Sequence, residues 1–194
     1  GMGLDKRIGD KFLHVGPGYG GSCFPKDTLA LIRIAQEYGV SSRIVEAVVE
    51  VNASQKARMV KKIKDALGNS LTNKKIAVLG LTFKPETDDM RDAPSLTILP
   101  SLLDKGAKII AHDPEGIKEA KKLLSSKIEY GETIDKTVSG ADGVILMTEW
   151  NQYRGLDLTH LENLMNGNVF IDLRNVYDPK LMLESKLEYF CIGR

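Results

Sequence analysis

Apolar positions in the first third of the chain recur with the spacing of α-helices. In residues 28–38 the apolar side chains fall near one helical face, and Gly39 supplies a stop signal. A second helix is predicted from about Ser42 to Leu67. At 1.5 Å per residue that helix would be about 40 Å long, which exceeds the width of a small domain. We therefore expect another surface to cover part of it.

Beyond residue 73 the pattern changes to short apolar runs that alternate with helical stretches. Strands are predicted at 75–83, 107–114, 143–150, 168–175 and 187–193. Helices are predicted at 95–105, 117–124, 133–138, 159–165 and 179–185, with Pro100 as an interruption in the first of these. This alternation predicts an α/β fold with a mainly parallel sheet covered on both faces. The chain accordingly divides into a helical segment, residues 1–70, and an α/β domain, residues 71–194.

Composition and charge narrow the classes of function. The 27 Lys and Arg residues nearly balance the 26 Asp and Glu residues, so bulk charge predicts neither a nucleic-acid partner nor a membrane surface. No apolar run approaches the roughly 20 residues of a membrane span. The two cysteines, Cys23 and Cys191, do not form a disulfide framework, which favours a reducing, cytoplasmic setting. The three histidines lack metal-ligand spacing, so no metal site is expected.

The stretch GPGYGGSCFPKD, residues 16–27, allows two incompatible interpretations. Gly16, Gly18 and Gly21 match the G-x-G-x-x-G spacing of a dinucleotide-binding turn. Such a turn needs a strand before it and an acidic residue about 20 residues later. Here the preceding KFLHV is a short apolar run, and the chain 20 residues later lies inside an apolar helix. The context therefore argues against a pyrophosphate turn.

The same stretch has the features of a reactive thiol. Cys23 lies just before Pro25, which suits the first turn of a helix, and a helix N-terminus stabilises a thiolate. Lys26 adds a nearby cation, and Asp27 could accept a proton or orient a water molecule. The alternative is a buried cysteine that packs as a small hydrophobic residue. The surrounding residue types favour the nucleophile.

Three segments together carry a family resemblance: GPGYGGSCFPKD, FKPETDDMRDAPS (residues 83–95) and FIDLRNVYD (residues 170–178). They closely resemble the UDP-glucose 6-dehydrogenases within the wider family of nucleotide-sugar dehydrogenases. The resemblance covers nearly the whole chain and corresponds to the later half of such enzymes. It implies a central helical dimerisation segment followed by a Rossmann-like, mainly parallel nucleotide-sugar-binding domain. It also implies that NAD is bound mainly by an N-terminal domain outside this chain, and that this chain alone is inactive.

The resemblance assigns roles to individual positions. Cys23 matches the catalytic nucleophile, and Asp27 matches a carboxylate that assists water in hydrolysis. Lys26 and Arg91 match NAD contacts. The positions that match contacts to the sugar nucleotide are Arg7, Phe12, Leu13, His14, Val15, Gly16, Gly20, Phe83, Lys84 and Arg174.

The residues themselves support part of this assignment. Lys84 and Arg174 each follow an apolar strand, and the carboxyl ends of parallel strands open onto a binding crevice. Two cations there suit a diphosphate, although both could be ordinary surface charges. Asp113 ends a strand as the ribose-binding acid of an NAD domain does. The turn after the first strand lacks the glycine pattern, so NAD is not assigned to this domain. Trp150 is interpreted as a core or cleft-wall residue.

The resemblance implies an NAD-dependent oxidation of UDP-glucose to UDP-glucuronate. In it Cys23 would trap an aldehyde as a thiohemiacetal, and a thioester would then be hydrolysed. The alternatives are a dehydrogenase of GDP-mannose or of a UDP-N-acetylhexosamine, or a nucleotide-sugar-binding dimerisation module without turnover. The apolar residues of the long helix, among them Ile44 and Val48, predict a homodimer through that helix.

Overall fold

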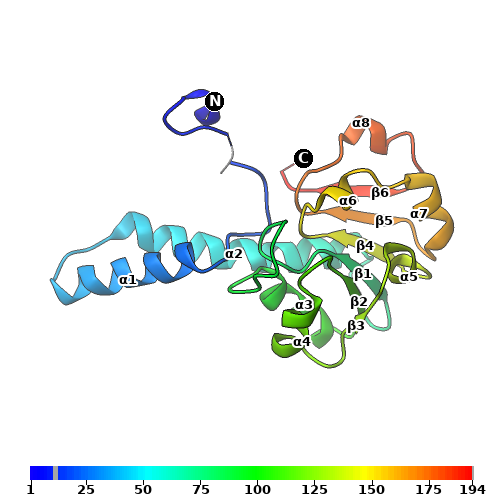
Figure 1. Ribbon diagram of the computed structural model, residues 1–194, viewed down its shortest axis with the longest axis horizontal. Helices are drawn as coiled ribbons and strands as arrows, with labels where there is room; N and C mark the ends of the chain where they lie inside the picture. The colour runs from blue at the N-terminus through cyan, green and yellow to red at the C-terminus, as the bar shows by residue number, and fades with distance from the viewer. Residues whose placement is uncertain (11–12, 194) are drawn as a thin grey trace.

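Two long helices lead into a parallel sheet in the computed structural model, which describes residues 1–10 and 13–193 (Figure 1). A short 3₁₀ turn, η1 (Met2–Leu4), opens the chain. Helix α1 (Cys23–Glu37) is followed by helix α2 (Arg43–Ala66), and the two pack side by side as a hairpin that projects from the sheet. Helix α1 begins before the predicted stretch 28–38 because Pro25 is tolerated in the first turn, where backbone N–H groups lack helical partners.

The rest of the chain forms a six-stranded sheet with the order β3-β2-β1-β4-β5-β6, in which every neighbouring pair is parallel. The strands are β1 (Lys75–Leu79), β2 (Lys108–His112), β3 (Glu129–Tyr130), β4 (Gly143–Leu146), β5 (Val169–Asp172) and β6 (Glu188–Cys191). The helices are α3 (Ser95–Asp104), α4 (Ile117–Leu123), α5 (Ile134–Val138), α6 (Asn151–Arg154), α7 (Leu158–Leu164) and α8 (Pro179–Met182). This strand order is that of a Rossmann-like fold, so the predicted fold class is confirmed.

Alternate residues of the strands feed two separate apolar layers. On one face Ile76 and Val78 of β1 pack with side chains from α2, α3 and α4. On the other face Ala77 and Leu79 pack with side chains from α5, α6, α7 and α8. Because both faces are covered, the central strands β1, β4 and β5 are mostly apolar and buried, as expected of a parallel sheet.

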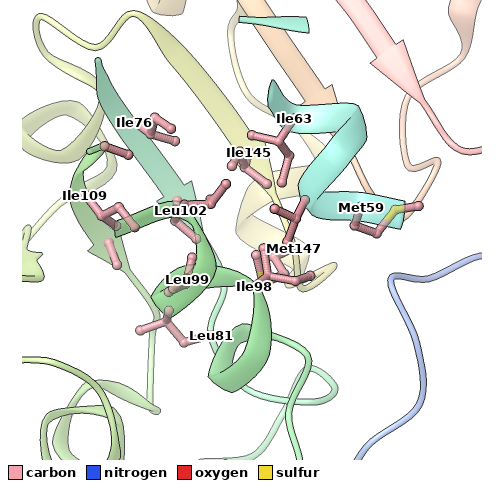
Figure 2. Close-up of a cluster of buried hydrophobic side chains, with 14 of the residues drawn as sticks. Met59, Ile63, Ile76, Leu81, Ile98, Leu99, Leu102, Ile109, Ile145 and Met147 are labelled. Carbon is pink, nitrogen blue, oxygen red and sulfur yellow. The ribbon is translucent and has the colours of Figure 1, made fainter. Parts of the chain in front are cut away.

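Helix α2 belongs to both parts of the molecule. Its buried residues, Met59, Val60 and Ile63, all lie toward its C-terminal end. Figure 2 shows Met59 and Ile63 against the layer that includes Ile145 of β4 and Leu102 of α3. The preceding turns of α2 leave the sheet and pair with α1 instead. A single continuous helix therefore connects the hairpin rigidly to the core.

Four differences from the predicted elements have physical causes. The strand predicted at 75–83 ends at Leu79, because Gly80 turns the chain with φ +94° against Thr148. Strand β3 and helix α6 were not predicted, since each is too short to show a period. Pro100 lies inside α3 without ending it, and burial of that helix against the sheet outweighs the lost hydrogen bond.

Candidate functional site

The strand order places a crevice at the carboxyl ends of β1, β4 and β5. The chain leaves β1 and β4 toward opposite sides of the sheet, and ligands of open α/β sheets bind at such a switch point. Lys84 follows β1, Glu149 follows β4 and Arg174 follows β5. All three line a cavity of about 1000 Å³.

The other wall of this cavity comes from the glycine-rich loop and from α2. The lining residues outside the sheet domain are His14, Gly16, Gly18, Tyr19, Gly20, Phe24, Ile44, Ala47, Val48, Val51, Asn52 and Gln55. The cavity thus lies where the hairpin meets the sheet, and three segments that are far apart in sequence share it. An apolar wall that faces a few polar groups is typical of a small-molecule site.

Arg174 is the most enclosed cation of the cavity. Its Nη2 donates to Oε1 of Glu149 at 2.5 Å, and the two side chains keep only 12% and 15% of their exposed area. Nε of Arg174 and Oε2 of Glu149 are buried and have no hydrogen-bond partner. Buried polar groups are normally satisfied, so both atoms retain capacity for a ligand that fills the cavity.

The turn after β5 fixes the direction of Arg174. Asp172, fully buried, accepts a hydrogen bond from the backbone N–H of Arg174 at 2.9 Å and another from that of Tyr177 at 3.0 Å. Asn175, with φ +51°, exchanges two 2.9 Å hydrogen bonds with the backbone of Ile192. The hydroxyl of Tyr189 also donates to Asp172, at 2.9 Å. The Asp-x-Arg-Asn sequence is therefore a structural unit that presents one guanidinium.

The glycines of residues 16–21 allow protein groups to approach the loop closely. A Cβ atom on Gly16 would lie 2.5 Å from Nη1 of Arg174, and one on Gly21 would lie 2.8 Å from the ring of Phe83. Residues 13–15, just before the loop, do not form a strand. The G-x-G-x-x-G match is thus explained by packing against the sheet domain, and the requirements of a dinucleotide turn are not met.

Cys23 is the first residue of α1 and is exposed. Its Sγ lies 3.6 Å from Oγ of Ser22. The carboxylate of Asp89 raises the pKa of Arg91, and a smaller contribution comes from Cys23, so the guanidinium lies within electrostatic reach of the sulfur. In the same first turn, Nζ of Lys26 lies 3.2 Å from Asp27. The first turn of α1 therefore contains an exposed thiol, a lysine and a carboxylate.

Asp113 follows β2, and its side chain reaches the turn after β1, which is the turn that binds phosphate in a dinucleotide domain. One of its oxygens accepts hydrogen bonds from the backbone N–H groups of Leu81 and Thr82, and the other from those of Glu115 and Gly116. Its side chain is buried, and Trp150 also donates to it at 3.3 Å. A carboxylate thus uses the N–H groups that a pyrophosphate would need, and Asp113 is a structural acid. Trp150 lies in the core, as the sequence indicated.

Two regions of the chain match domains of one protein family. Residues 77–179 match the UDP-binding domain, and residues 1–54 the central domain, of the UDP-glucose/GDP-mannose dehydrogenase family. The chain belongs to this family. The family resemblance inferred from the three sequence segments is confirmed.

Relatives and solved structures agree with this assignment. The chain is 46% identical over its whole length to a UDP-glucose 6-dehydrogenase of Rhizobium meliloti and 44% identical to one of Bacillus subtilis, and it spans 44% of the length of each. A UDP-glucose dehydrogenase structure from Pyrobaculum islandicum superposes with a TM-score of 0.83 at 39% identity, over 97% of this chain and 41% of that one. An NDP-N-acetyl-D-galactosaminuronic acid dehydrogenase from Methanosarcina mazei gives 0.80 at 28% identity, over 92% and 39%.

The structure brings together only some of the residues predicted to contact a sugar nucleotide. Those that line the cavity are His14, Gly16, Gly20, Phe83, Lys84 and Arg174. Arg7 is exposed and pairs with Asp5 at 2.7 Å, while Leu13 and Val15 are exposed and do not line the cavity. Phe12 lies outside the described residues. Arg91 makes a two-pronged contact with Asp89, at 2.9 and 2.8 Å, and the carboxylate's pKa is lowered by it.

Sequence reasoning did not find Glu149, Asn52 or Gln55. Glu149 was assigned to a predicted strand, and nothing in the sequence shows that Arg174 would be its partner. Asn52 and Gln55 are two of many polar residues within a long helix, so their direction toward the loop becomes visible only in the folded chain.

Among residues 1–10 and 13–193, no three His, Cys, Asp or Glu side chains converge as metal ligands would. Within the same ranges, no helix combines the length and apolar character needed to cross a bilayer.

Proposed function

We propose that this chain is the thiol-bearing and sugar-nucleotide-binding part of an NAD-dependent UDP-glucose 6-dehydrogenase, which oxidises UDP-glucose to UDP-glucuronate. One observation carries the proposal. The cations that follow β1 and β5 line the same cavity as the glycine-rich loop that leads into Cys23. The relatives at 46% and 44% identity bear that enzyme's name.

Arg174 and Lys84 are proposed to hold the diphosphate. Arg174 is directed by its turn and retains an unpartnered Nε, while the Nζ of Lys84 lies 5.3 Å from the centre of the Phe83 ring. A guanidinium can give a phosphate two parallel hydrogen bonds, which fixes orientation as well as charge. Glu149 and Glu86 also line the cavity, so the site is not uniformly cationic, and its acids could accept hydrogen bonds from hydroxyl groups of the ligand.

Cys23 is proposed as the nucleophile. Its thiolate adds to the C6 aldehyde carbon of the sugar, forming a C–S bond while the carbonyl oxygen gains a proton, and the aldehyde is thereby retained. Asp27 is proposed to take a proton from the water that later cleaves the thioester. NAD, when bound, supplies the hydride acceptor for both oxidations. Lys26 and Arg91 are exposed cations near the thiol, which fits contact with an anionic cofactor.

A homodimer through the hairpin, with α2 at its centre, is proposed as the assembled form. Large apolar side chains of the hairpin that do not line the cavity remain exposed, among them Leu29 at 55%, Leu31 at 50% and Ile34 at 52%. Soluble proteins seldom leave so many apolar groups uncovered, and twofold symmetry is the commonest way to cover a surface with a second copy.

Calorimetric titration of UDP into the chain tests the proposed site. Binding should weaken about tenfold or more in Lys84→Ala, and affinity should fall as salt is raised. Lys105→Ala, which removes an exposed lysine just after α3, is the matched control and should bind normally. Failure of UDP to bind, or equal affinity in the Lys84→Ala variant and the wild type, would place the site elsewhere.

A further inference from the structure

Helix α2 is hydrogen-bonded to the glycine-rich loop through the side chain of Asn52, a residue to which no role has been assigned. Oδ1 of Asn52 accepts a hydrogen bond from the backbone N–H of Tyr19 at 2.8 Å, and its Nδ2 donates to the carbonyl of the same residue at 3.2 Å. One turn along α2, Nε2 of Gln55 donates to the carbonyl of Gly16 at 3.3 Å. The side chain of Asn52 thus pairs with one residue of the loop in both directions, as a neighbouring strand would.

The opposite side of the loop is held by the sheet domain. The N–H of Gly21 donates to the carbonyl of Arg91 at 2.7 Å, and the ring of Phe83 packs against Gly21. Tyr19 and Gly21 are therefore fixed from two sides immediately before Cys23. Small displacements of the loop would move the thiol relative to the cavity.

Gly18 makes the contact with α2 possible. Its φ of +131° is a conformation that residues with side chains rarely adopt. A Cβ at this position would lie 2.8 Å from Oδ1 of Asn52 and 3.3 Å from Cγ of Lys56. Lys56 is half-buried beneath the loop, and its Nζ lies 3.4 Å from the carbonyl of Asp92 on the far side. Glycine at position 18 and asparagine at position 52 are thus complementary.

We propose that Asn52 is a positioning residue that sets the place of Cys23 by fixing the loop to α2. Helix α2 is anchored in the core of the sheet domain by Met59 and Ile63. The hydrogen bonds of Asn52 therefore fix the thiol relative to the domain that presents Arg174. The inference rests on the proposed role of Cys23 as nucleophile. The two bonds to Tyr19 can be tested independently of that role.

Hydrogen exchange of the loop, measured on the 194-residue chain by mass spectrometry, tests the two hydrogen bonds between Asn52 and Tyr19. Asn52→Ala removes both bonds to Tyr19, and amides of residues 16–22 should exchange about tenfold faster. Amides of β1 and β4 should keep their wild-type rates. Ser54→Ala, an exposed change on the same helix, is the control and should leave the loop unchanged. Loop exchange within about twofold of wild type, or equal acceleration in β1, would overturn the proposal.

Asn52→Asp distinguishes specific positioning from general loosening. An ionised carboxylate can still accept from the N–H of Tyr19, but it repels the carbonyl. A protonated carboxyl can both accept and donate, as the amide does. After correction for intrinsic rates, the loop in Asn52→Asp should regain protection as pH falls from about 7 to about 4. Wild type should show no such recovery. An Asn52→Asp loop without pH dependence would contradict the two-bond geometry.

The alkylation rate of Cys23 tests whether the hydrogen bonds of Asn52 also position the thiol. In Asn52→Ala the rate at which iodoacetamide labels Cys23 should change by about threefold or more, because the loop no longer fixes where the sulfur lies. The buried Cys191 should be unaffected. An unchanged rate at Cys23 would overturn the positioning role. Failure of UDP to bind, with the loop still loosened by Asn52→Ala, would instead refute the proposed function and leave the role proposed for Asn52 intact.

Discussion

The hairpin and the sheet domain differ in how far they bury their apolar side chains. Helix α1 buries none of its residues, although Leu31 and Ile34 lie on it. In the sheet domain Leu99 and Ile145 are fully buried, and apolar layers cover both faces. The sheet domain therefore has a core of its own. The hairpin is joined to that core by the C-terminal part of α2, and we propose that a second copy of the chain covers its exposed apolar side chains. The difference shows where the stability of the chain resides and which surface is open to a partner.

The chemistry divides along the same line. The sheet domain supplies Lys84 and Arg174, and the hairpin supplies Cys23 at the start of α1. The well-packed region holds the charges that need fixed geometry. The less-packed region presents an exposed thiol at the start of α1.

Truncation of an apolar side chain should lower the free energy of unfolding far more in the sheet domain than in the hairpin. Leu99→Ala removes a fully buried side chain between α3 and the sheet, and should lower the free energy of unfolding by about 2–5 kcal/mol. Ile34→Ala on α1, where the side chain is 52% exposed, should cost less than about 1 kcal/mol in dilute solution. Urea denaturation measures both. Equal losses would show that α1 is as tightly packed as the core.

The buried pair at the cavity gives the next largest effect. Arg174→Ala leaves Glu149 enclosed without its partner, so the variant should lose about 1–3 kcal/mol of stability. The double variant Arg174→Ala/Glu149→Gln should recover part of this loss, since the uncompensated charge is gone. A double-variant cycle by urea denaturation provides the test. Strictly additive losses would mean that the two side chains do not stabilise each other.

A charge introduced among the exposed apolar residues of α1 should weaken dimerisation. The wild-type chain should scatter light as a dimer at micromolar concentration. Leu31→Asp should weaken association about tenfold or more, because the interface would bury an unpaired charge. Gln36→Asp adds the same charge at an exposed polar position of α1 and should stay dimeric. A monomeric wild type at these concentrations would refute the proposed dimer.

The smallest effect is expected at the surface of the sheet domain. Nε2 of His160 lies 2.9 Å from Asp135, and this hydrogen bond raises the pKa of the imidazole. A group with a raised pKa in the folded state stabilises fully below its ordinary value, near 6.5, and loses that contribution as pH rises through the folded value. The thermal midpoint should thus fall slightly from pH 6 to pH 8, and less in His160→Gln. A shift as large as that of Leu99→Ala would show that exposed pairs matter as much as the core.

The sequence predicted the parts of the fold that repeat. The buried strands appear as continuous apolar runs such as 75–79 and 143–146, and α2 shows a long helical period, so these elements could be found. Strand β3 is only Glu129–Tyr130 and owes its existence to the neighbouring strand β2, which no local pattern reveals. The start of α1 near Cys23 was expected from Pro25, which suits a first helical turn, although residues 23–27 show no apolar period.

The candidate site was predictable only where one residue signals its place. Lys84 and Arg174 follow apolar strands, so their position at the sheet edge could be expected. The pairing of Arg174 with Glu149 depends on which strands become neighbours, and the hydrogen bonds between Asn52 and Tyr19 join residues 33 positions apart. Such contacts are set by tertiary packing, and no local pattern carries them.

We propose that Cys23 and the cations of the sheet domain bind one ligand. Alkylation with iodoacetamide, mapped by peptide mass spectrometry with and without UDP-glucose, tests it most directly. We expect Cys23 to react at least about tenfold faster than the buried Cys191. We also expect UDP-glucose to slow labelling of Cys23 alone and Lys84→Ala to weaken this shielding. Labelling of Cys23 that stays unchanged at saturating UDP-glucose, or faster labelling of Cys191, would contradict a shared site.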